Sequence, residues 1–235
     1  MNAKRGYVPE DDKNFSEPAI ETMRTASRHI RYLINEGYDL KQASTFVGNH
    51  YVLSERQRLA LMRSMATDQQ LTERKSKEKS KIAGEEVWID GFNTVITLEV
   101  MFSDSILFEC ADGTIRDLAA LRGTYRIIPE TEGAVRIMLD ALTEMEAGLV
   151  HILLDQPVSN SGRLKTLIAE IAENYPIDLD IQILKEVDKT LWDKENVITS
   201  DSIILDRCKS WVNLMRKCVD KHGRKEPIRV WNIEK

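Results

Sequence analysis

The stretch Val87-Trp88-Ile89-Asp90-Gly91-Phe92-Asn93 decides the fold of this chain. An apolar triplet that leads into Asp-Gly is typical of a short buried strand followed by a turn. Three later stretches, 106–113, 151–155 and 196–201, also run from apolar residues into an aspartate, and 181–184 is a further strand candidate. These runs predict the strands of one sheet.

Helical patterns lie between these strands. Apolar residues recur at three- and four-residue steps over 130–147 and again over 163–174. Strands that alternate with helices need crossover connections, so we expect an α/β fold with three layers, α/β/α, around a mostly parallel sheet. Residues 95–102 show no clear period and leave helix and strand both open.

The first third of the chain has a different pattern. Amphipathic helices are predicted over 17–35 and 40–47, and a third begins at Ser54, where Gln57 completes a capping box. Residues 68–81 contain one apolar side chain and indicate a charged linker or an exposed helical extension. We predict a small all-α domain over 1–67, a charged linker over 68–83 and the α/β domain over 84–235.

Composition narrows the class of protein. Of the 235 residues, 42% are hydrophobic and 30% charged, which suits a sizeable core with room for a small extra domain. No run of eighteen apolar residues occurs and the first residues are polar, so we expect neither export nor a membrane. The three scattered cysteines, Cys110, Cys208 and Cys218, favour a reducing compartment, and we expect a cytoplasmic protein.

Charge divides the chain into two parts. Residues 1–83 carry 15 Lys and Arg against 11 Asp and Glu, a net +4, while the remainder carries 18 against 27, a net −9. Arg24, Arg28 and Arg31 share one helical stripe that can follow a phosphate backbone, which predicts RNA binding. The competing interpretation is a solubilising face whose aliphatic stems pack over apolar neighbours.

An aspartate follows each of four predicted strands: Asp90, Asp112, Asp155 and Asp201. In an open parallel sheet, ligands bind beyond the carboxyl ends of the strands. Carboxylates that converge there repel one another unless a cation neutralises them, and oxygen ligands suit Mg²⁺ or Mn²⁺. We therefore expect a divalent-cation site and, as the leading reaction, hydrolysis of a phosphodiester bond.

These residues resemble a known family. The segment from Trp88 to Asn93 resembles the opening motif of PIN-like ribonucleases of the NYN type, 153–155 resembles the third-strand aspartate of that group, and 198–201 its late Thr-x-Asp strand end. The likeness covers roughly 87–219. It implies that Asp90, Asp155 and Asp201 are catalytic metal ligands and that Asn93 holds a ligand or the loop. The whole chain also resembles an uncharacterised prokaryotic family of unknown function.

Two segments depart from the PIN-like pattern. Residues 112–117 have no clear counterpart, and 155–163 is unusually elaborate. In the second, four small residues precede a helix and can either cradle a phosphate or simply cap the helix. The predicted phosphate-binding residues are Ser159, Asn160, Ser161, Gly162, Arg116 and Arg163, and the predicted supporting residues are Asn93, Asp117 and Asp188.

The leading hypothesis is a metal-dependent ribonuclease with RNA as its partner. The alternative is a non-catalytic module that keeps the PIN-like fold and binds RNA or protein, and a homodimer is compatible with either. A phosphatase that uses Asp90 as nucleophile is disfavoured, because the second aspartate of the haloacid dehalogenase type is absent two positions on, where Phe92 stands.

Overall fold

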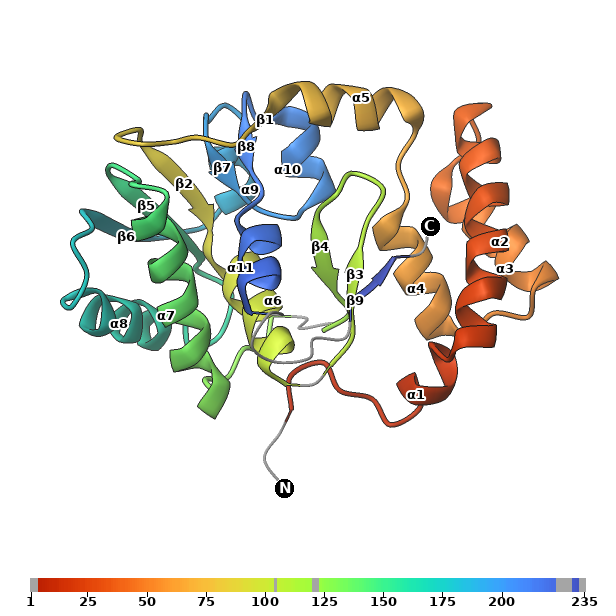
Figure 1. Cartoon of the computed structure of the whole chain (residues 1–235), viewed down its shortest axis with the longest axis horizontal. Coiled ribbons are helices and arrows are strands. Elements are labelled where there is room, and N and C mark those ends of the chain that lie inside the picture. The colour runs from red at the N-terminus through yellow and green to blue at the C-terminus, as the bar shows by residue number, and fades with distance from the viewer. Residues whose placement is uncertain (1–3, 104, 120–122, 223–229, 233–235) are drawn as a thin grey trace.

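The main sheet confirms the predicted fold class. The structure is a computed structural model that describes residues 4–103, 105–119, 123–222 and 230–232. A six-stranded sheet has the order β1-β8-β7-β2-β5-β6, and every strand pair in it is parallel (Figure 1). Its strands are β1 (Glu78–Lys79), β2 (Val87–Asp90), β5 (Val150–Asp155), β6 (Leu179–Leu184), β7 (Val197–Ile198) and β8 (Trp211–Val212).

Both faces of this sheet are buried, because alternate residues of a strand point to opposite sides. In β5, Ile152 and Leu154 belong to one apolar cluster, and Leu153 between them belongs to another. The helices on the first face are α6 (Gly91–Phe102), α7 (Pro129–Glu144), α8 (Ser161–Ala172) and α11 (Leu214–His222). Those on the second face are α9 (Val187–Leu191) and α10 (Ser202–Arg207). The α/β/α layering follows.

The strand order creates a switch point between β2 and β7. From β2 the chain continues to β5 and β6 on one side, and then returns to β7 and β8 on the other. The connections therefore leave β2 and β7 in opposite directions, which opens a crevice at their carboxyl ends. Asp90 ends β2 at this crevice, and Asp201 follows β7 on its other side.

The predicted strand at 106–108 does not belong to the main sheet, and this part of the prediction is wrong. β3 (Leu107–Glu109) pairs antiparallel with β4 (Ile115–Asp117) and parallel with β9 (Val230–Asn232) in a separate three-stranded sheet. The cause is the short loop between β3 and β4, where Gly113 has φ +78° and lets the chain turn back at once. A hairpin replaces the crossover that a parallel strand needs.

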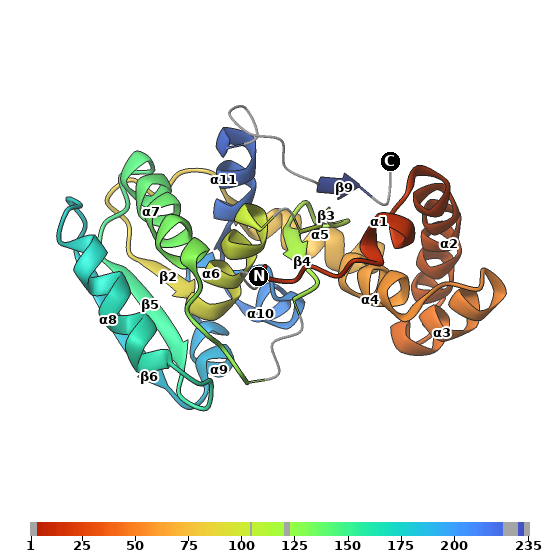
Figure 2. The ribbon, with the colours of Figure 1, turned by 90° about the horizontal axis from the view of Figure 1, so that it is seen from below.

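The three predicted N-terminal helices are confirmed. They are α2 (Glu17–Asn35), α3 (Leu40–His50) and α4 (Glu55–Ser64), preceded by the short α1 (Asp11–Asn14). Ser54 and Gln57 form the expected capping box of α4. The apolar cluster of this region also contains Phe108 and Cys110, so the β3–β4 hairpin lies between the helices and the main sheet (Figures 1 and 2).

The charged segment after α4 is largely helical. α5 (Asp68–Lys77) begins with a capping box at Thr67 and Gln70, and β1 follows it directly and joins the edge of the main sheet. Arg74 on α5 is only 2% exposed and forms ion pairs with Asp112 and Asp206. The main sheet therefore begins at Glu78, ahead of the predicted start of the α/β domain at residue 84.

Gly91 allows α6 to start close to β5. A Cβ atom at this position would lie 2.6 Å from Leu154 Cδ2 and 2.8 Å from the carbonyl oxygen of Leu153. Separations below 3.0 Å at a backbone atom require the chain to shift. The glycine after Asp90 thus fixes the depth at which the β2–α6 turn sits on its neighbouring strand.

Candidate active site

Asp90 is the central acidic residue of the carboxyl edge. It ends β2 and caps α6, with Oδ1 accepting a 3.4 Å hydrogen bond from the backbone N–H of Asn93. Its Oδ2 accepts a 2.9 Å hydrogen bond from the Thr199 hydroxyl, which follows β7. Asp90 is 6% exposed. The hydrogen bond to Thr199 therefore joins the two strands of the switch point through a buried carboxyl group.

Three more aspartates lie around Asp90. Burial raises the pKa of Asp90 to about 8; the Thr199 hydrogen bond opposes this rise, whereas the charges of Asp201, Asp155 and Asp188 add to it. The pKa of Asp155 is raised by burial and by Asp188. That of Asp188 is raised by burial and by Asp201. Asp155, Asp188 and Asp201 are thus near enough to Asp90 for their charges to act on it, at the edge where Asp90, Asp112, Asp155 and Asp201 were expected to converge.

The charge of Asp201 acts on the Arg116 guanidinium, which is itself paired with Asp112, but the described residues place no cation in an ion pair with this acidic edge. Among the described residues, none of the four aspartates forms an ion pair with Lys, Arg or His. Asp201 uses Oδ1 to cap α10, at 2.8 Å from the N–H of Ile203 and 3.1 Å from that of Ile204. Its Oδ2 stays available.

Asn93 fixes the loop after β7. Its Oδ1 accepts hydrogen bonds from the Ser200 N–H at 2.8 Å and from the Ser200 hydroxyl at 3.0 Å, and the Thr199 hydroxyl lies at 3.5 Å. The two donors of Ser200 set the orientation of the amide, because only an acceptor can face them. The Nδ2 donors of Asn93 are therefore directed away from the Ser200 loop. Sequence analysis left a loop role and a ligand role open for Asn93, and these contacts provide the loop role.

The donors of this edge suit a hard divalent cation in their chemistry, since all are carboxylate oxygens. Their present positions do not form a coordination shell. In the part of the chain that the structure describes, no three His, Cys, Asp or Glu side chains stand close enough together to hold one metal ion. Side-chain rotation of Asp155, Asp188 or Asp201 toward Asp90 would be needed to close a shell.

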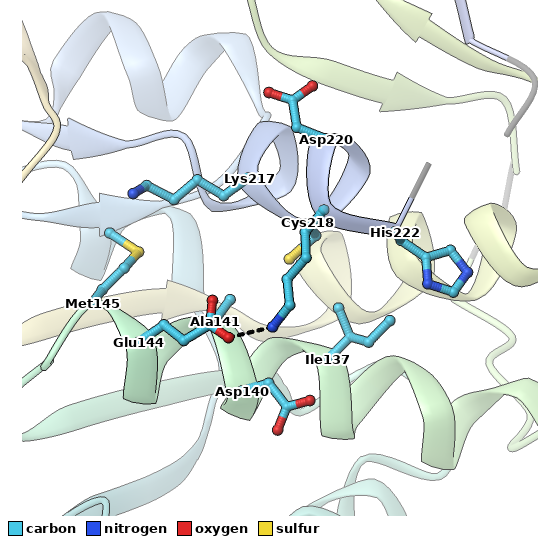
Figure 3. Close-up of a pocket in the computed structure, with 10 residues that line it drawn as sticks. Ile137, Asp140, Ala141, Glu144, Met145, Lys217, Cys218, Asp220 and His222 are labelled. Carbon is cyan, nitrogen blue, oxygen red and sulfur yellow. Dashed lines mark hydrogen bonds and ion pairs between the residues drawn. The ribbon is translucent and has the colours of Figure 1, made fainter. Parts of the chain in front are cut away.

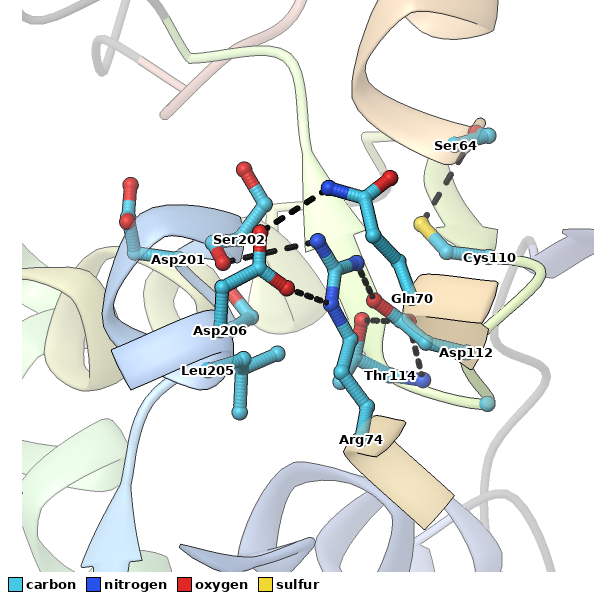
Figure 4. Close-up of polar contacts among 12 residues, drawn as sticks. Ser64, Gln70, Arg74, Cys110, Asp112, Thr114, Asp201, Ser202, Leu205 and Asp206 are labelled. Atoms are coloured by element: carbon cyan, nitrogen blue, oxygen red, sulfur yellow. Dashed lines mark hydrogen bonds and ion pairs between the residues drawn. The ribbon is translucent and has the colours of Figure 1, made fainter. Parts of the chain in front are cut away.

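Asp112 does not join this edge, which corrects its prediction as a metal ligand. It lies in the β3–β4 turn, and its Oδ2 accepts a 2.7 Å hydrogen bond from Arg74 (Figure 4). The same oxygen accepts a second 2.7 Å hydrogen bond from Arg116. Burial acts to raise the pKa of Asp112, but Arg116, Thr114 and Arg74 outweigh it and hold this pKa below its ordinary value. A carboxylate enclosed by two guanidinium groups is a structural ion pair. We name Arg74, Asp112 and Arg116 the buried ion-pair cluster.

Arg116 and Asp117 also make structural contacts. The Arg116 guanidinium donates to the Ser200 carbonyl at 2.6 Å and to the carbonyl of Arg63, which gives it a structural role, and its phosphate role stays a prediction. Asp117 accepts from the Thr97 hydroxyl and from the Ala119 N–H, each at 2.7 Å. Both residues hold the hairpin against α6 and the Ser200 loop.

Comparison with known proteins places the chain in a family. A family model described as a domain of unknown function, DUF5616, matches residues 79–217. The chain belongs to the DUF5616 family. A second model, a protein of unknown function (DUF434), matches residues 22–77, which are the helical region up to the end of α5. The two matches meet at the junction of α5 and β1.

The DUF5616 chain also has a relative of similar length. An uncharacterised protein from Methanocaldococcus jannaschii is 34% identical over 203 residues, which cover 85% of this chain and 97% of that protein. No solved structure matches the chain. Neither family description names an activity, so chemistry has to be argued from the acidic edge itself.

The predicted phosphate loop of the DUF5616 region is mostly occupied by internal contacts. The Ser159 hydroxyl donates to the Tyr125 carbonyl and accepts from the Tyr125 N–H, both at 2.9 Å, and Asn160 donates to the same carbonyl at 2.7 Å. These two residues hold the segment at Tyr125 rather than an anion. Ser161, Gly162 and Arg163 form the first turn of α8, and their phosphate role stays a prediction.

The predicted arginine stripe on α2 is partly engaged. Arg31 forms an ion pair with Asp68 at 2.7 Å, and Arg24 pairs with Glu21. Arg28 is exposed and donates to the Thr25 hydroxyl at 3.1 Å. RNA binding by these three arginines stays a prediction.

Among the described residues of this DUF5616 protein, no helix combines the length and apolar character needed to span a membrane.

A pocket of about 460 Å³ lies elsewhere, between α7 and α11. Figure 3 shows Glu144 on α7 and Cys218 on α11 on its two sides. Glu144 is already paired with Lys221, and burial raises the pKa of Cys218 to about 12, which keeps its thiol protonated and unreactive. This pocket in the helix layer contains none of the predicted site residues of the DUF5616 chain.

Sequence analysis missed two contributors to the site. Thr199 was seen only as part of a strand end, although its hydroxyl binds Asp90 directly. Arg63 was not among the predicted site residues, yet it lines a pocket beside Asn93 and Asp201. On α4, the side chains of Leu59, Met62 and Arg63 alternate with buried residues. This helical pattern could have indicated that Arg63 borders the interior of the protein.

Proposed function

We propose that this chain is a metal-dependent ribonuclease that hydrolyses phosphodiester bonds at the carboxyl edge of its parallel sheet. The observation that carries the proposal is Asp90, a buried carboxyl group whose pKa is raised to about 8 beside three other aspartates, none of which forms an ion pair with a described residue. Strongly perturbed pKa values in a crevice are typical of functional sites. Burial is the main cause of this raised pKa and the neighbouring aspartates add to it; a bound divalent cation would favour the ionised carboxylates and so oppose both effects.

The residues divide the work as follows. Asp90, Asp155 and Asp201 would hold Mg²⁺ or Mn²⁺, with Asp188 as a supporting carboxylate. The bound cation would lower the pKa of a water molecule and stabilise charge on the phosphate. Thr199 keeps the Asp90 carboxyl group in place. Asn93, fixed through its oxygen, directs its Nδ2 donors away from the loop, where they can bind a non-bridging phosphate oxygen.

The resemblance to PIN-like nucleases of the NYN type supports the same proposal. The aspartates that it singles out, Asp90, Asp155 and Asp201, end β2, end β5 and follow β7, which are three adjacent strands. Short motifs that are far apart in the sequence thus meet at one edge. The resemblance supplies the substrate class, RNA, and the structure supplies the electrostatic reason for a cation.

A cleavage assay tests the proposal. Purified full-length protein is incubated with labelled single-stranded and structured RNA and with Mn²⁺ or Mg²⁺, and we expect cleavage that EDTA stops. Asp90→Asn should abolish cleavage without lowering the melting temperature. The matched control is Asp178→Asn, an exposed aspartate directly before β6 at the opposite edge of the sheet, which should cleave as the wild type does. Equal activity in the Asp90→Asn variant would refute the proposal.

One observation favours a second function, a non-catalytic module that binds RNA. In the described residues no three acidic side chains surround a single point, and both oxygens of Asp90 already accept hydrogen bonds. This function predicts RNA binding that weakens with salt, survives chelation and is never followed by cleavage. The same assay, with a filter-binding arm in EDTA, separates the two functions.

A further inference from the structure

A second pocket adjoins the acidic edge. Its volume is about 380 Å³, within the range of roughly 300–1,000 Å³ that small-molecule sites occupy. One wall is α4, which contributes Leu59, Met62 and Arg63, and the facing wall is α6, with Asn93 and Ile96. The pocket therefore lies between the helical region and the α/β region, and neither builds it alone.

The pocket shares two residues with the acidic edge. Asn93 and Asp201 line it, and Asp201 is one of the charges that raise the pKa of Asp90. If one unit of a linear polymer lies at the acidic edge, the neighbouring unit of that polymer lies at the mouth of this pocket. Because the link is two shared side chains, the pocket and the edge form one continuous surface.

The lining combines apolar side chains with polar ones, which include the donors Arg63 and Arg116 and the carboxylates Asp117 and Asp201. Leu59, Met62 and Ile96 are incompletely buried and face the pocket. Arg63 has a side chain 36% exposed; its Nη1 donates to the Asp117 carbonyl, and within the described chain no contact engages its Nε and Nη2. A guanidinium with a free pair of donors suits a phosphate or the edge of a base. Apolar walls suit the faces of a base.

We propose that this pocket binds one nucleoside of single-stranded RNA, next to the phosphate cleaved at the acidic edge. The inference rests on the proposed ribonuclease function and deepens it. The base lies against Leu59, Met62 and Ile96, and Arg63 binds the adjoining phosphate. A base inside a duplex is stacked and cannot enter a pocket without unpairing, so the pocket selects unpaired RNA.

Methyl NMR tests the pocket without any need for cleavage. The probe is adenosine 5′-monophosphate, titrated into the full chain labelled at the methionine methyl groups. We expect the Met62 signal to shift on binding and the signal of Met23, which is fully buried in the helical core, to stay in place. Arg63→Ala should weaken binding at least about tenfold, since a charge-assisted contact is lost. Arg136→Ala, an exposed arginine on α7, is the matched control and should bind as the wild type does.

Cleavage kinetics provide the second arm. Met62→Trp fills the pocket from an exposed position, 37% accessible, and should fold normally. We expect it to raise the KM for unpaired RNA about tenfold or more with little change in kcat, because the metal-holding aspartates are untouched. Met62→Leu, of similar volume, should restore the wild-type KM.

The outcomes separate this proposal from the ribonuclease proposal. Wild-type cleavage with unchanged KM in both Arg63→Ala and Met62→Trp, or cleavage of duplex as fast as of unpaired RNA, would overturn the pocket and leave the nuclease intact. Absence of cleavage together with an Arg63-dependent Met62 shift would refute the nuclease and keep a nucleotide pocket. No Met62 shift at millimolar nucleotide, with full cleavage by Met62→Trp, also refutes the pocket.

Discussion

Two buried aspartates of this protein have opposite electrostatic surroundings. Asp112 lies between Arg74 and Arg116, and its pKa is held below the ordinary value. Asp90 lies among Asp155, Asp188 and Asp201, and its pKa is raised to about 8. Both side chains are removed from water. The sign of the neighbouring charges accounts for the difference, because it decides whether the buried carboxyl group is stable as an anion.

This difference distinguishes an aspartate that stabilises the fold from aspartates that can bind a ligand. The buried ion-pair cluster is complete within the protein, and it connects α5, the hairpin and the Ser200 loop. The acidic edge is incomplete, because no cation of the described residues balances it. Natural proteins retain such imbalance where a ligand supplies the missing charge. We therefore propose a functional role for the edge and a structural role for the cluster.

The largest effect is expected from breaking the cluster. Asp112→Ala removes the buried carboxylate that Arg74 and Arg116 share, leaving Arg74 with Asp206 alone, and should lower the free energy of unfolding by about 3–5 kcal/mol. Urea denaturation measures it. Glu132→Ala removes an exposed partner of Arg136 and should change stability by less than about 0.5 kcal/mol. A loss below about 1 kcal/mol for Asp112→Ala would mean that the cluster is not structural.

The acidic edge should respond to pH in a defined direction. Between about pH 4 and pH 8 the folded protein keeps the Asp90 proton while the unfolded chain loses it, so the folded state binds more protons. Stability therefore falls as pH rises through this window, by at most about 1.4 kcal/mol for each pH unit. Asp90→Asn should flatten the slope and be more stable than wild type at pH 8. Parallel slopes in urea titrations of the two proteins would contradict the raised pKa.

The next effect concerns how the edge is positioned. Gly91→Ala places a Cβ atom against Leu154 and the Leu153 carbonyl and should cost about 1–3 kcal/mol, since the β2–α6 turn must move. Gly162→Ala, in the first turn of α8 with open space around its Cα, is the control and should be neutral or slightly stabilising. Thermal unfolding followed by circular dichroism compares them. Equal melting temperatures would show that the turn has room.

The smallest effect tests whether a cation completes the edge. At a tenfold excess of Mn²⁺ over its Kd, the folded state should gain about 1.4 kcal/mol, seen as a rise in melting temperature at pH 7.5. The rise should be much smaller for Asp90→Asn and unchanged for Asp178→Asn. A rise of the same size in all three proteins would place the metal elsewhere.

The helices and the central strands could be predicted from local pattern. Apolar periods and the capping box at Ser54 and Gln57 gave the helical region, and the apolar run at 87–89 gave the central strand of the sheet. The strand at 107–109 was assigned to the wrong sheet. Its local pattern is that of a buried strand, and the pairing partner depends on a tight turn at Gly113 that composition does not reveal.

The candidate site was predicted in part for the same reason. Asp90, Asp155, Asp188 and Asp201 follow or flank strands of one parallel sheet, so a sequence that locates the strands also locates these residues. Asp112 also follows a predicted strand, yet its ion pairs with Arg74 and Arg116 give it a structural role. Arg74 lies in a segment without apolar pattern, where burial of a guanidinium has no local signature.

By itself the sequence determined the α/β class, the helical N-terminal region and the set of strand-end aspartates, because each depends on residues close together in the chain. Only the tertiary structure decided which aspartates share an edge, which one lies between arginines, and that α4 and α6 enclose a pocket beside Asn93. Electrostatic environment and cavities depend on residues that are distant in sequence, so they exist only once the chain has folded.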